Sequence, residues 1–309
     1  MEACKVGFQK ECEEAYMKIK KLIAVIMMLT MIITLAACSK KEEDTSADDG
    51  SKATDENVAE ENTDATASDA SSLTIKDGVL QVGTEASYPP MEYLDEDGTT
   101  YIGFDIEVAQ AIADELGLKL EIDDVAWDGI FASLDSDRYD CIIAGVSINE
   151  EREAAYNLTK PYVANRIALV TKKDSDITSP EDLKGKSVAY QTETTSDYYM
   201  KDLIKNGLEP SETYPYDKII QAFDDLKVGR VDSVMTDIVV ASYYMGNDSD
   251  KLEVVWKSEE SEPMAICLKK GNDALTEKIE KAIDTLYENG KMAEIATKYF
   301  GYDITEDVR

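Results

Sequence analysis

Short apolar runs alternate with stretches of helical periodicity along the chain from residue 73 onward. The apolar runs predict strands at 79–83, 118–123, 139–146, 167–172, 188–191, 213–216, 231–235 and 264–268. Apolar positions at helical spacing predict helices at 104–116, 129–134, 196–205, 219–228, 275–288 and 292–299. A glycine-centred turn at 182–186 opens the second half of the series. Strands and helices that follow one another in turn are typical of an α/β protein with a parallel sheet.

The amino-terminal part has a different pattern. Lys18, Lys20 and Lys21 precede an apolar run at 22–36 that leads through Ala37 into Cys38. A basic segment, about 15 apolar residues and small residues at the end are typical of a signal peptide. A membrane-spanning helix needs about 20 apolar residues, so this run is short for one. Residues 1–16 carry charges ahead of the basic segment, and we therefore expect Met17 to be the true start.

Residues 39–72 contain almost no large apolar side chains and are rich in Asp, Glu, Ser, Thr and Ala. Such a segment cannot bury enough apolar surface to fold, and we expect a flexible acidic tether. The remaining residues, 73–309, are enough for one large domain or two small lobes.

Charge and composition exclude several classes of protein. The chain has a net charge of −32, which makes nucleic acid an improbable partner. It contains no His, which removes Ser-His-Asp triads and nearly every ordinary zinc site. No GxxxxGK[ST] run is present, so the chain has no P-loop for ATP. Of the five Cys, Cys141 and Cys267 lie in the part expected to fold; buried free thiols are the default interpretation, and a bridge between them is the alternative.

Polar residues that suit ligand contact follow the first predicted strand. Glu85, Ser87 and Tyr88 come directly after it, and Pro89 and Pro90 stiffen the exit. Open α/β sheets bind small ligands at the carboxyl ends of their strands. The alternative is a polar surface turn with one packed Tyr.

The same segment resembles the start of the mature domain in bacterial extracellular solute-binding proteins of family 3, the polar amino-acid receptors of ABC importers. The resemblance covers roughly residues 76–302, with Met91 where Phe is usual. It rests here on Thr84, Glu85, Tyr88, Pro89, Pro90, Glu92, Gly103, Phe104 and Asp105. It implies a type II periplasmic-binding-protein-like fold, in which two α/β lobes are joined by a two-strand hinge and the ligand lies in the cleft. Lobe 1 would comprise 73–165 and 262–309, and lobe 2 would comprise 166–261.

The resemblance also implies a group that holds the ligand carboxylate. Ser147 to Arg152 follow the strand that ends in Ala144 and Gly145, and resemble the family's S-I-T-x-x-R element, with Asn149 in place of Thr. In that element the Arg guanidinium grips the carboxylate bidentately and nearby backbone amides assist. The alternative is a surface Arg152 paired with an adjacent Glu.

The second lobe is expected to add further contacts. Residues 192–196 resemble the family's G-T-T loop, which implies a contact from Thr195 and a backbone contact from Thr194; Glu193 stands where Gly is common, so either it points outward or the loop differs. Residues 229–237 resemble the G-R-x-D-x-x-x-x-D segment, which implies that Asp237 accepts from the ligand ammonium. A helix N-cap is the alternative for Asp237.

Two rings and two polar side chains are expected to line the space for the ligand side chain. Tyr88 and Trp127 align with aromatic positions that face each other across the cleft, although plain core packing is the alternative for Trp127. Glu85 and Gln191 align with positions that contact the ligand side chain. The segments around Glu85 and Gln191 resemble receptors for arginine and related cationic amino acids, whereas the segment after Trp127 resembles cystine-binding members. Both ligands stay open, and the cationic one is favoured.

The sequence thus predicts a substrate-binding lipoprotein that delivers an amino acid to a membrane permease powered by a separate ATPase. Cys38 follows Leu-Ala-Ala and resembles a lipobox, which implies lipidation on its sulfur; an ordinary signal peptide or a short membrane helix is the alternative. We expect a monomer without cofactor or metal, held by its lipid outside the cytoplasmic membrane, or in the periplasm of a diderm cell. A cyclohexadienyl-dehydratase-like enzyme, with Glu85 or Glu193 as acid or base, is the alternative from another class.

Overall fold

The computed structural model describes residues 73–305 and 308. Within this part the strands form two five-stranded sheets and one small three-stranded sheet. The predicted signal peptide, the lipidation site at Cys38 and the acidic tether lie outside the described residues.

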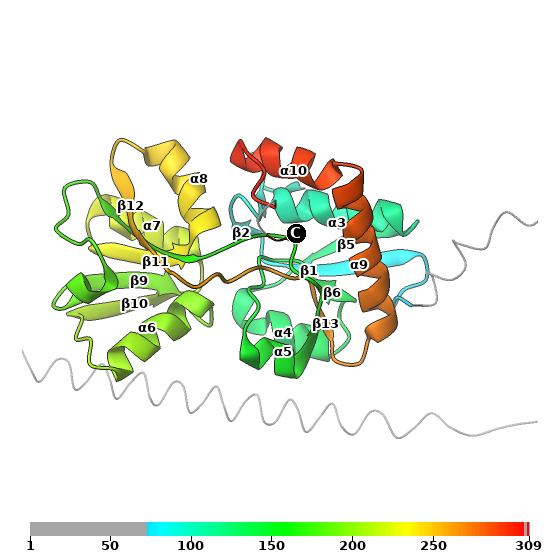
Figure 1. Cartoon of the computed structure of the whole chain (residues 1–309), viewed down its shortest axis with the longest axis horizontal. Helices are drawn as coiled ribbons and strands as arrows, with labels where there is room; N and C mark the ends of the chain where they lie inside the picture. Colours follow the sequence, from blue (N-terminus) through cyan, green and yellow to red (C-terminus); the bar gives the residue numbers. More distant parts are fainter. Residues whose placement is uncertain (1–72, 306–307, 309) are drawn as a thin grey trace, which may run out of the picture. The chain divides into compact units, whose positions relative to one another are not determined.

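The first sheet has the order β5-β1-β6-β13-β7 (Figure 1). Its strands are β1 (Val79–Thr84), β5 (Lys119–Asp124), β6 (Cys141–Ile142), β7 (Tyr156–Leu158) and β13 (Cys267–Lys269). β1 is parallel to both β5 and β6, whereas β13 is antiparallel to both β6 and β7.

The second sheet has the order β10-β9-β11-β8-β12. Its strands are β8 (Ile167–Lys172), β9 (Ser187–Gln191), β10 (Glu212–Tyr216), β11 (Ser233–Asp237) and β12 (Leu252–Lys257). β9 is parallel to β10 and β11, but β8 is antiparallel to β11 and β12.

Both sheets are therefore mixed, and the expectation of parallel sheets is wrong. A strand-helix-strand unit makes its two strands parallel. The antiparallel pairs involve β8, which lies between β11 and β12, and β13, which lies between β6 and β7. No strand-helix-strand unit joins the two strands of any of these pairs, because the chain passes from one sheet to the other just before β8 and just before β13.

Helices cover both faces of the first sheet. α3 (Phe104–Glu115), α9 (Asp273–Glu288) and α10 (Lys291–Phe300) pack against one another, and Figure 1 shows α4 (Trp127–Asp135) and α5 (Glu150–Ala155) on the face opposite α3 and α10. α3 forms because its apolar residues recur at helical spacing, so that Phe104, Val108 and Ile112 lie fully buried on one side.

The second sheet has helices on both faces as well. α7 (Ile219–Val228) and α8 (Ile238–Asp248) lie on one face, and α6 (Thr195–Lys205) lies on the other (Figure 1). Thr194 caps α6 by accepting from the backbone N–H of Asp197. α7 ends at Gly229, whose φ of 75° is the left-handed conformation that suits glycine.

Most predicted elements appear close to their expected ends, and one strand is much shorter. Residues 139–146 were expected to form a strand, but only Cys141–Ile142 does so. The chain leaves the sheet because Gly145 has a φ of 55° and its N–H donates to the carboxylate of Asp105.

Several short elements were not predicted. The three-stranded antiparallel sheet of β2 (Ser87–Tyr88), β3 (Glu92–Leu94) and β4 (Tyr101–Ile102) is the clearest example. Its strands are too short to carry a visible alternation of apolar and polar residues. The helices α5 and α8 and the strands β7 and β12 were also missed.

The chain passes between the sheets twice, and the two connecting segments pair with each other. The first lies between β7 and β8, and the second between β12 and β13. Met264 N–H donates to Val163 O over 2.9 Å, and Glu262 N–H donates to Asn165 O over 2.9 Å. The fold therefore consists of two α/β lobes joined by a two-strand hinge.

Candidate functional site

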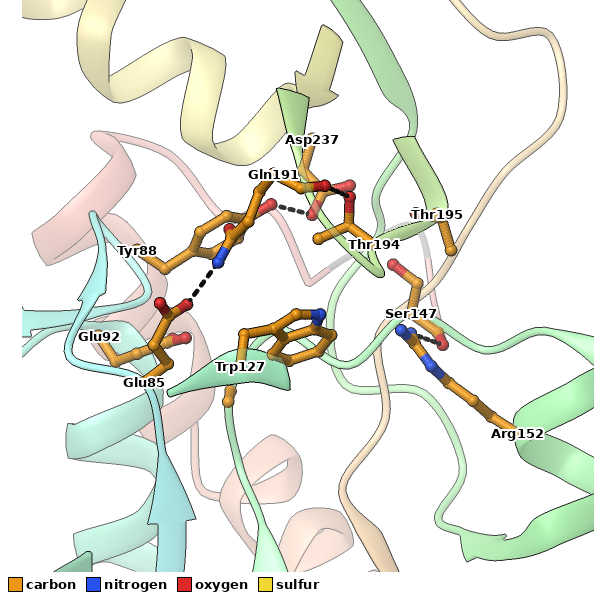
Figure 2. Close-up of a pocket in the computed structure, with 12 residues that line it drawn as sticks. Glu85, Tyr88, Glu92, Trp127, Ser147, Arg152, Gln191, Thr194, Thr195 and Asp237 are labelled. Carbon is orange, nitrogen blue, oxygen red and sulfur yellow. Dashed lines mark hydrogen bonds between the residues drawn. The ribbon is translucent and has the colours of Figure 1, made fainter. Parts of the chain in front are cut away.

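A pocket lies where side chains from both lobes meet (Figure 2), with an empty volume of about 300 Å³ that includes open solvent. Eleven of the twelve contact residues predicted from the sequence line it, and one further residue, Glu92, does so as well. The lining comprises Glu85, Tyr88, Glu92, Trp127, Ala144, Gly145, Ser147, Arg152, Gln191, Thr194, Thr195 and Asp237. Ser87 is outside this lining and donates from its hydroxyl to Glu85 Oε1 over 2.9 Å.

Arg152 lies at one end of the pocket and is only 6% exposed. Its position follows from the start of α5, where Asn149 Oδ1 accepts from the Arg152 backbone N–H over 2.8 Å. The guanidinium donates to Ser147 O over 2.8 Å and lies 5.4 Å from the Trp127 ring and 5.1 Å from the Phe131 ring. Burial lowers the pKa of Arg152 from its usual value.

No carboxylate among the described residues forms an ion pair with Arg152. The alternative of a surface Arg paired with an adjacent Glu is therefore wrong. A buried cation without an opposite charge strongly favours the arrival of an anion.

Asp237 is the last residue of β11 and is 5% exposed. It occupies the N-cap position of α8, but its side chain makes no capping hydrogen bond. Instead it accepts from Tyr88 OH over 2.5 Å and from Asn165 Nδ2 over 2.7 Å. Burial raises the pKa of Asp237, although these two donors act in the opposite direction. The carboxylate therefore faces the pocket rather than serving as a cap.

Glu85 lies at the end of the pocket away from Arg152 (Figure 2). It follows β1, and its Oε2 accepts from Gln191 Nε2 over 2.8 Å, a contact between the two lobes. Burial raises the pKa of Glu85 to about 7, while the hydrogen bonds from Gln191 and Ser87 act against this shift. The carboxyl group of Glu85 thus gives up its proton less readily than an ordinary Glu.

Trp127 lines the pocket and also packs in a small core cluster. Its ring packs edge-on against Phe131, with 5.5 Å between centroids. Its Nε1 donates to Glu193 O over 3.1 Å, which joins the lobes a second time. Figure 2 shows the indole between the Glu85 end and the Arg152 end.

The loop before α6 explains how Glu193 is tolerated where Gly is common. Glu193 has a φ of 59°, and its side chain is exposed. Its N–H donates to Asp197 Oδ2 over 2.9 Å, and Thr194 Oγ1 donates to Gln191 O over 2.8 Å. The loop therefore keeps the left-handed torsion and turns the carboxylate away from the pocket.

Glu92 is the lining residue that the site assignment from sequence missed. It belongs to the motif that carries the family resemblance, so its position was visible, but nothing in the sequence indicated that its side chain faces the pocket. It lies on β3, in the small sheet that the apolar pattern did not predict, and is 1% exposed.

Other candidate chemistry is absent from the described residues. They contain no group of three or more His, Cys, Asp or Glu side chains placed to hold a metal ion. No helix of 73–305 has the length and apolar character that crossing a membrane requires. Cys141 and Cys267 are both buried and free, so the bridged alternative is wrong.

The sequence profile of the bacterial extracellular solute-binding proteins, family 3, matches residues 80–302. The chain belongs to this family. It is similar to the L-cystine-binding protein TcyJ of Escherichia coli (strain K12), with 32% identity over 231 residues, 74% of this chain and 85% of that protein.

Two solved structures show the same fold. An ancestral arginine-binding protein bound to arginine has a TM-score of 0.69 and 40% identity, over 72% of this chain and 99% of that chain. The ancestral amino acid-binding protein AncCDT-1, a precursor of cyclohexadienyl dehydratase, has a TM-score of 0.67 and 32% identity, over 72% of this chain and 96% of that chain. The two lobes are therefore those of a type II periplasmic amino-acid-binding protein.

Proposed function

We propose that this protein is the substrate-binding component of an amino-acid ABC importer and that it captures a cationic amino acid of the arginine or lysine type. One observation carries the proposal. Three of the ionisable groups that line the pocket carry it: at one end a guanidinium with no carboxylate partner among the described residues, beside the middle a buried carboxylate, and at the other end the carboxyl group of Glu85. These three match the carboxylate, the α-ammonium and the side-chain cation of such a ligand.

The shared part of the ligand would be held by Arg152 and Asp237. The Arg152 guanidinium offers two parallel N–H donors to a carboxylate, and such bidentate pairs are among the strongest hydrogen bonds in proteins. Ser147 and Thr195 lie at the same end of the pocket (Figure 2). The Asp237 carboxylate would accept from the ammonium, while Tyr88 and Asn165 keep it oriented.

The side-chain end favours a cation over cystine. Glu85 is buried and becomes fully ionised when a positive group arrives. A guanidinium between Tyr88 and Trp127 would also gain about 0.5–2 kcal/mol from the ring faces. Cystine, the ligand named for TcyJ, would instead bring both an ammonium and a second carboxylate to the Glu85 end of the pocket, so that this end of the ligand has no net charge. Cystine is the second candidate because of that relative.

The proposal also includes the boundaries of the two lobes, the membrane anchor and the transport partners. Lobe 1 comprises 73–165 and 262–309, and lobe 2 comprises 166–261. The protein works as a monomer held outside the cytoplasmic membrane by a lipid on Cys38, and it passes its ligand to a permease with a separate ATPase. Replacement of Cys38 by Ala should release the protein from membranes; a C38A variant that stays membrane-bound would contradict the anchor.

An enzyme is the candidate from another class, because AncCDT-1 is described as a precursor of cyclohexadienyl dehydratase. A carboxyl group whose pKa is raised to about 7 by burial, as that of Glu85 is, suits general acid-base catalysis. The presence of both Arg152 and Asp237 in the pocket favours an amino acid over a cyclic acid that lacks the ammonium. Incubation with cyclohexadienyl acids and detection of the aromatic product would separate the two functions.

Thermal unfolding of the protein with each of the twenty amino acids, ornithine and cystine tests the proposal. A ligand at 100 times its dissociation constant should stabilise the fold by about 2.7 kcal/mol. We expect the largest increase in Tm with arginine or lysine. The absence of any increase with every compound would contradict the receptor function, and an increase with cystine alone would contradict the cationic preference.

A further inference from the structure

A contact between two aromatic rings joins the lobes outside the pocket. Tyr93 lies on β3 of lobe 1 and Tyr243 lies on α8 of lobe 2. Their ring centroids are 5.9 Å apart, and the ring planes are tilted by 53°. Neither residue lines the pocket. The two rings therefore link the lobes without being part of the ligand site.

Three hydrogen bonds also join the lobes, but each of them involves a residue that lines the pocket. They run from Tyr88 to Asp237, from Gln191 to Glu85 and from Trp127 to the carbonyl of Glu193. A substitution at any of these pairs would change the ligand site together with the contact between the lobes. The contact between Tyr93 and Tyr243 can be removed while every lining residue is kept.

The direction of the Tyr93 side chain follows from its strand. Successive side chains of a strand point to opposite faces. Glu92 lines the pocket, so the next residue, Tyr93, points to the other face of β3. β3 is the middle strand of the small sheet, where Tyr93 lies opposite Ser87 on β2 and Ile102 on β4. Lobe 1 thus fixes the position of this ring by itself.

Tyr243 is held in place by other rings of lobe 2. Its ring packs edge-on against Tyr244, with 5.5 Å between the centroids, and Tyr244 stacks on Phe223 with 3.7 Å between the centroids. Tyr244 and Phe223 are both buried. Because each of the two contacting rings is ordered within its own lobe, little side-chain freedom is lost when they meet.

We infer that Tyr93 and Tyr243 form a clasp between the lobes, which closes when the lobes close and raises the affinity for every amino-acid ligand by a similar factor. The inference rests on the proposed function, in which a ligand is captured between two lobes, and a two-strand hinge permits the lobes to open and close. A contact that exists in only one of two conformations shifts the equilibrium toward that conformation. Since the clasp does not touch the ligand, this shift is the same for all ligands that bind the closed conformation.

The test is a double-mutant cycle of Tyr93→Ala, Tyr243→Ala and the double variant, with dissociation constants for arginine and cystine measured by calorimetry. Each single variant should weaken every ligand that the wild type binds by about two- to tenfold, which is the range expected for an aromatic pair. The double variant should bind within about twofold of the weaker single variant, because the contact is already lost. Tyr93→Phe keeps the ring and should bind within about twofold of the wild type.

The Tm of the ligand-free proteins separates the clasp from permanent packing of the fold. In the open conformation the rings are apart, so the two substitutions should act independently on this Tm. Coupling between them in the Tm of the ligand-free protein, with no coupling in affinity, would show a permanent contact and would overturn the inference.

Tyr199→Ala is the matched control. Tyr199 stacks on Trp256 with 5.6 Å between the centroids, and both rings belong to lobe 2 and lie outside the pocket lining. The variant removes a similar ring contact within one lobe. It should lower Tm and leave the dissociation constants within about twofold of the wild type.

The other outcomes distinguish the clasp from the proposed function. Additive losses of affinity in the double variant, or a loss for one of two bound ligands and not for the other, would overturn the clasp, while binding by the wild type would leave the receptor function standing. A wild type that binds cystine and not arginine supports the clasp if the cycle shows coupling with cystine, although the cationic preference then fails. A wild type that binds no amino acid would overturn both proposals together.

Discussion

The two ends of the pocket hold their charges in different ways. At one end, Arg152 is buried against two aromatic rings and has one carbonyl partner and no carboxylate partner among the described residues. At the other end, Glu85 has two hydrogen-bond donors and a pKa of about 7. A guanidinium does not lose its proton at any physiological pH, but Glu85 can become neutral.

This difference separates general recognition from selectivity. The Arg152 end carries a permanent charge, so it should bind the carboxylate that all α-amino acids share, under all conditions. At the other end, Glu85 can be ionised when a cation binds and protonated when no cation is present. This end should therefore decide which amino acid binds. The following predictions test this division, from the largest expected effect to the smallest.

Arg152→Ala should weaken the binding of every amino-acid ligand by at least about 100-fold, because a buried charged partner of the carboxylate is lost. The Tm of the ligand-free protein should change little, since the variant also removes a buried unpaired charge. Calorimetry and thermal unfolding measure the two effects.

Arg138→Ala removes the same charge from an exposed pair with Asp123 outside the pocket and should leave affinity unchanged. Arg152→Lys should lie between wild type and Ala, because Lys keeps the charge and loses the bidentate geometry. If Arg152→Ala affected cationic ligands only, the division between the two ends would be wrong.

Glu85→Gln should weaken arginine binding by about 10- to 100-fold, because hydrogen bonds to a charged group are stronger than those to an amide. Ligands with uncharged side chains should change by less than about threefold. A panel of dissociation constants checks this, with Glu96→Gln on an exposed loop as the control for loss of one negative charge. Equal losses for all ligands would show that Glu85 supports the fold rather than selectivity.

Arginine affinity should rise with pH, by about tenfold between pH 6 and pH 8. In the ligand-free protein the pKa of Glu85 is about 7, and only its ionised form pairs with the cation, so binding releases a proton. The other groups that act on Glu85 are Ser87, Gln191, Lys218 and Asp124, and of these only the first two donate hydrogen bonds to it. Calorimetry in buffers of different ionisation enthalpy counts the protons released. Affinity that stays flat across this range would contradict a titrating selectivity group.

As pH rises, the stability of the ligand-free protein should change in the opposite direction to its affinity for arginine. The pKa of Glu85 is raised from 4.5 to about 7 by folding, so the folded protein holds more protons than the unfolded chain in this window. Stability of the ligand-free protein should therefore fall as pH rises from 4.5 to 7. Glu262, with its pKa also raised to about 7, contributes the same trend, so Glu85→Gln should reduce the slope without removing it. Thermal unfolding of both proteins across this pH range measures the two slopes.

Glu193→Gly should have the smallest effect, a gain of about 0.5–1 kcal/mol in stability with affinity unchanged within about threefold. The loop joins the two ends of the pocket, since Gln191 precedes it and Thr195 follows it. Its left-handed torsion costs a residue with a side chain about 1–2 kcal/mol, and the greater freedom of Gly in the unfolded chain offsets part of the gain. Thermal unfolding checks the prediction.

Glu193→Ala retains a β-carbon and should give no such gain. If Glu193→Gly instead changed the affinity for one ligand and not for another, the exposed carboxylate would belong to the selectivity end after all.

Much of the fold followed from the pattern of apolar residues. The buried strand 79–83 and the helices near 104–116 and 219–228 carry enough residues for their periodicity to be seen, and the structure has them almost unchanged. The small sheet of β2, β3 and β4 was missed because strands of two or three residues have no readable period. The sequence did not show that β8, β12 and β13 are antiparallel to neighbouring strands. The direction of these strands depends on how the chain enters each lobe from the other one.

The site residues were found by another route, the motifs that resemble the family. Residues near strand ends, such as Glu85 and Asp237, stand out because polar groups follow directly after apolar runs. Glu92 was assigned no role, since its burial depends on contacts with residues distant in the sequence. Burial, together with the negative charges of Asp105 and Glu85, raises the pKa of Glu92 well above its ordinary value.

The sequence by itself determined the α/β class, the succession of long elements and the motif residues at the strand ends, because these depend on neighbours within one turn or one strand. Only the tertiary structure decided that Glu85 of lobe 1 meets Gln191 of lobe 2, and that Arg152 is left without a carboxylate partner among the described residues. Burial and charge at a point in space depend on residues far apart in the chain, and hydrophobic periodicity carries no information about them.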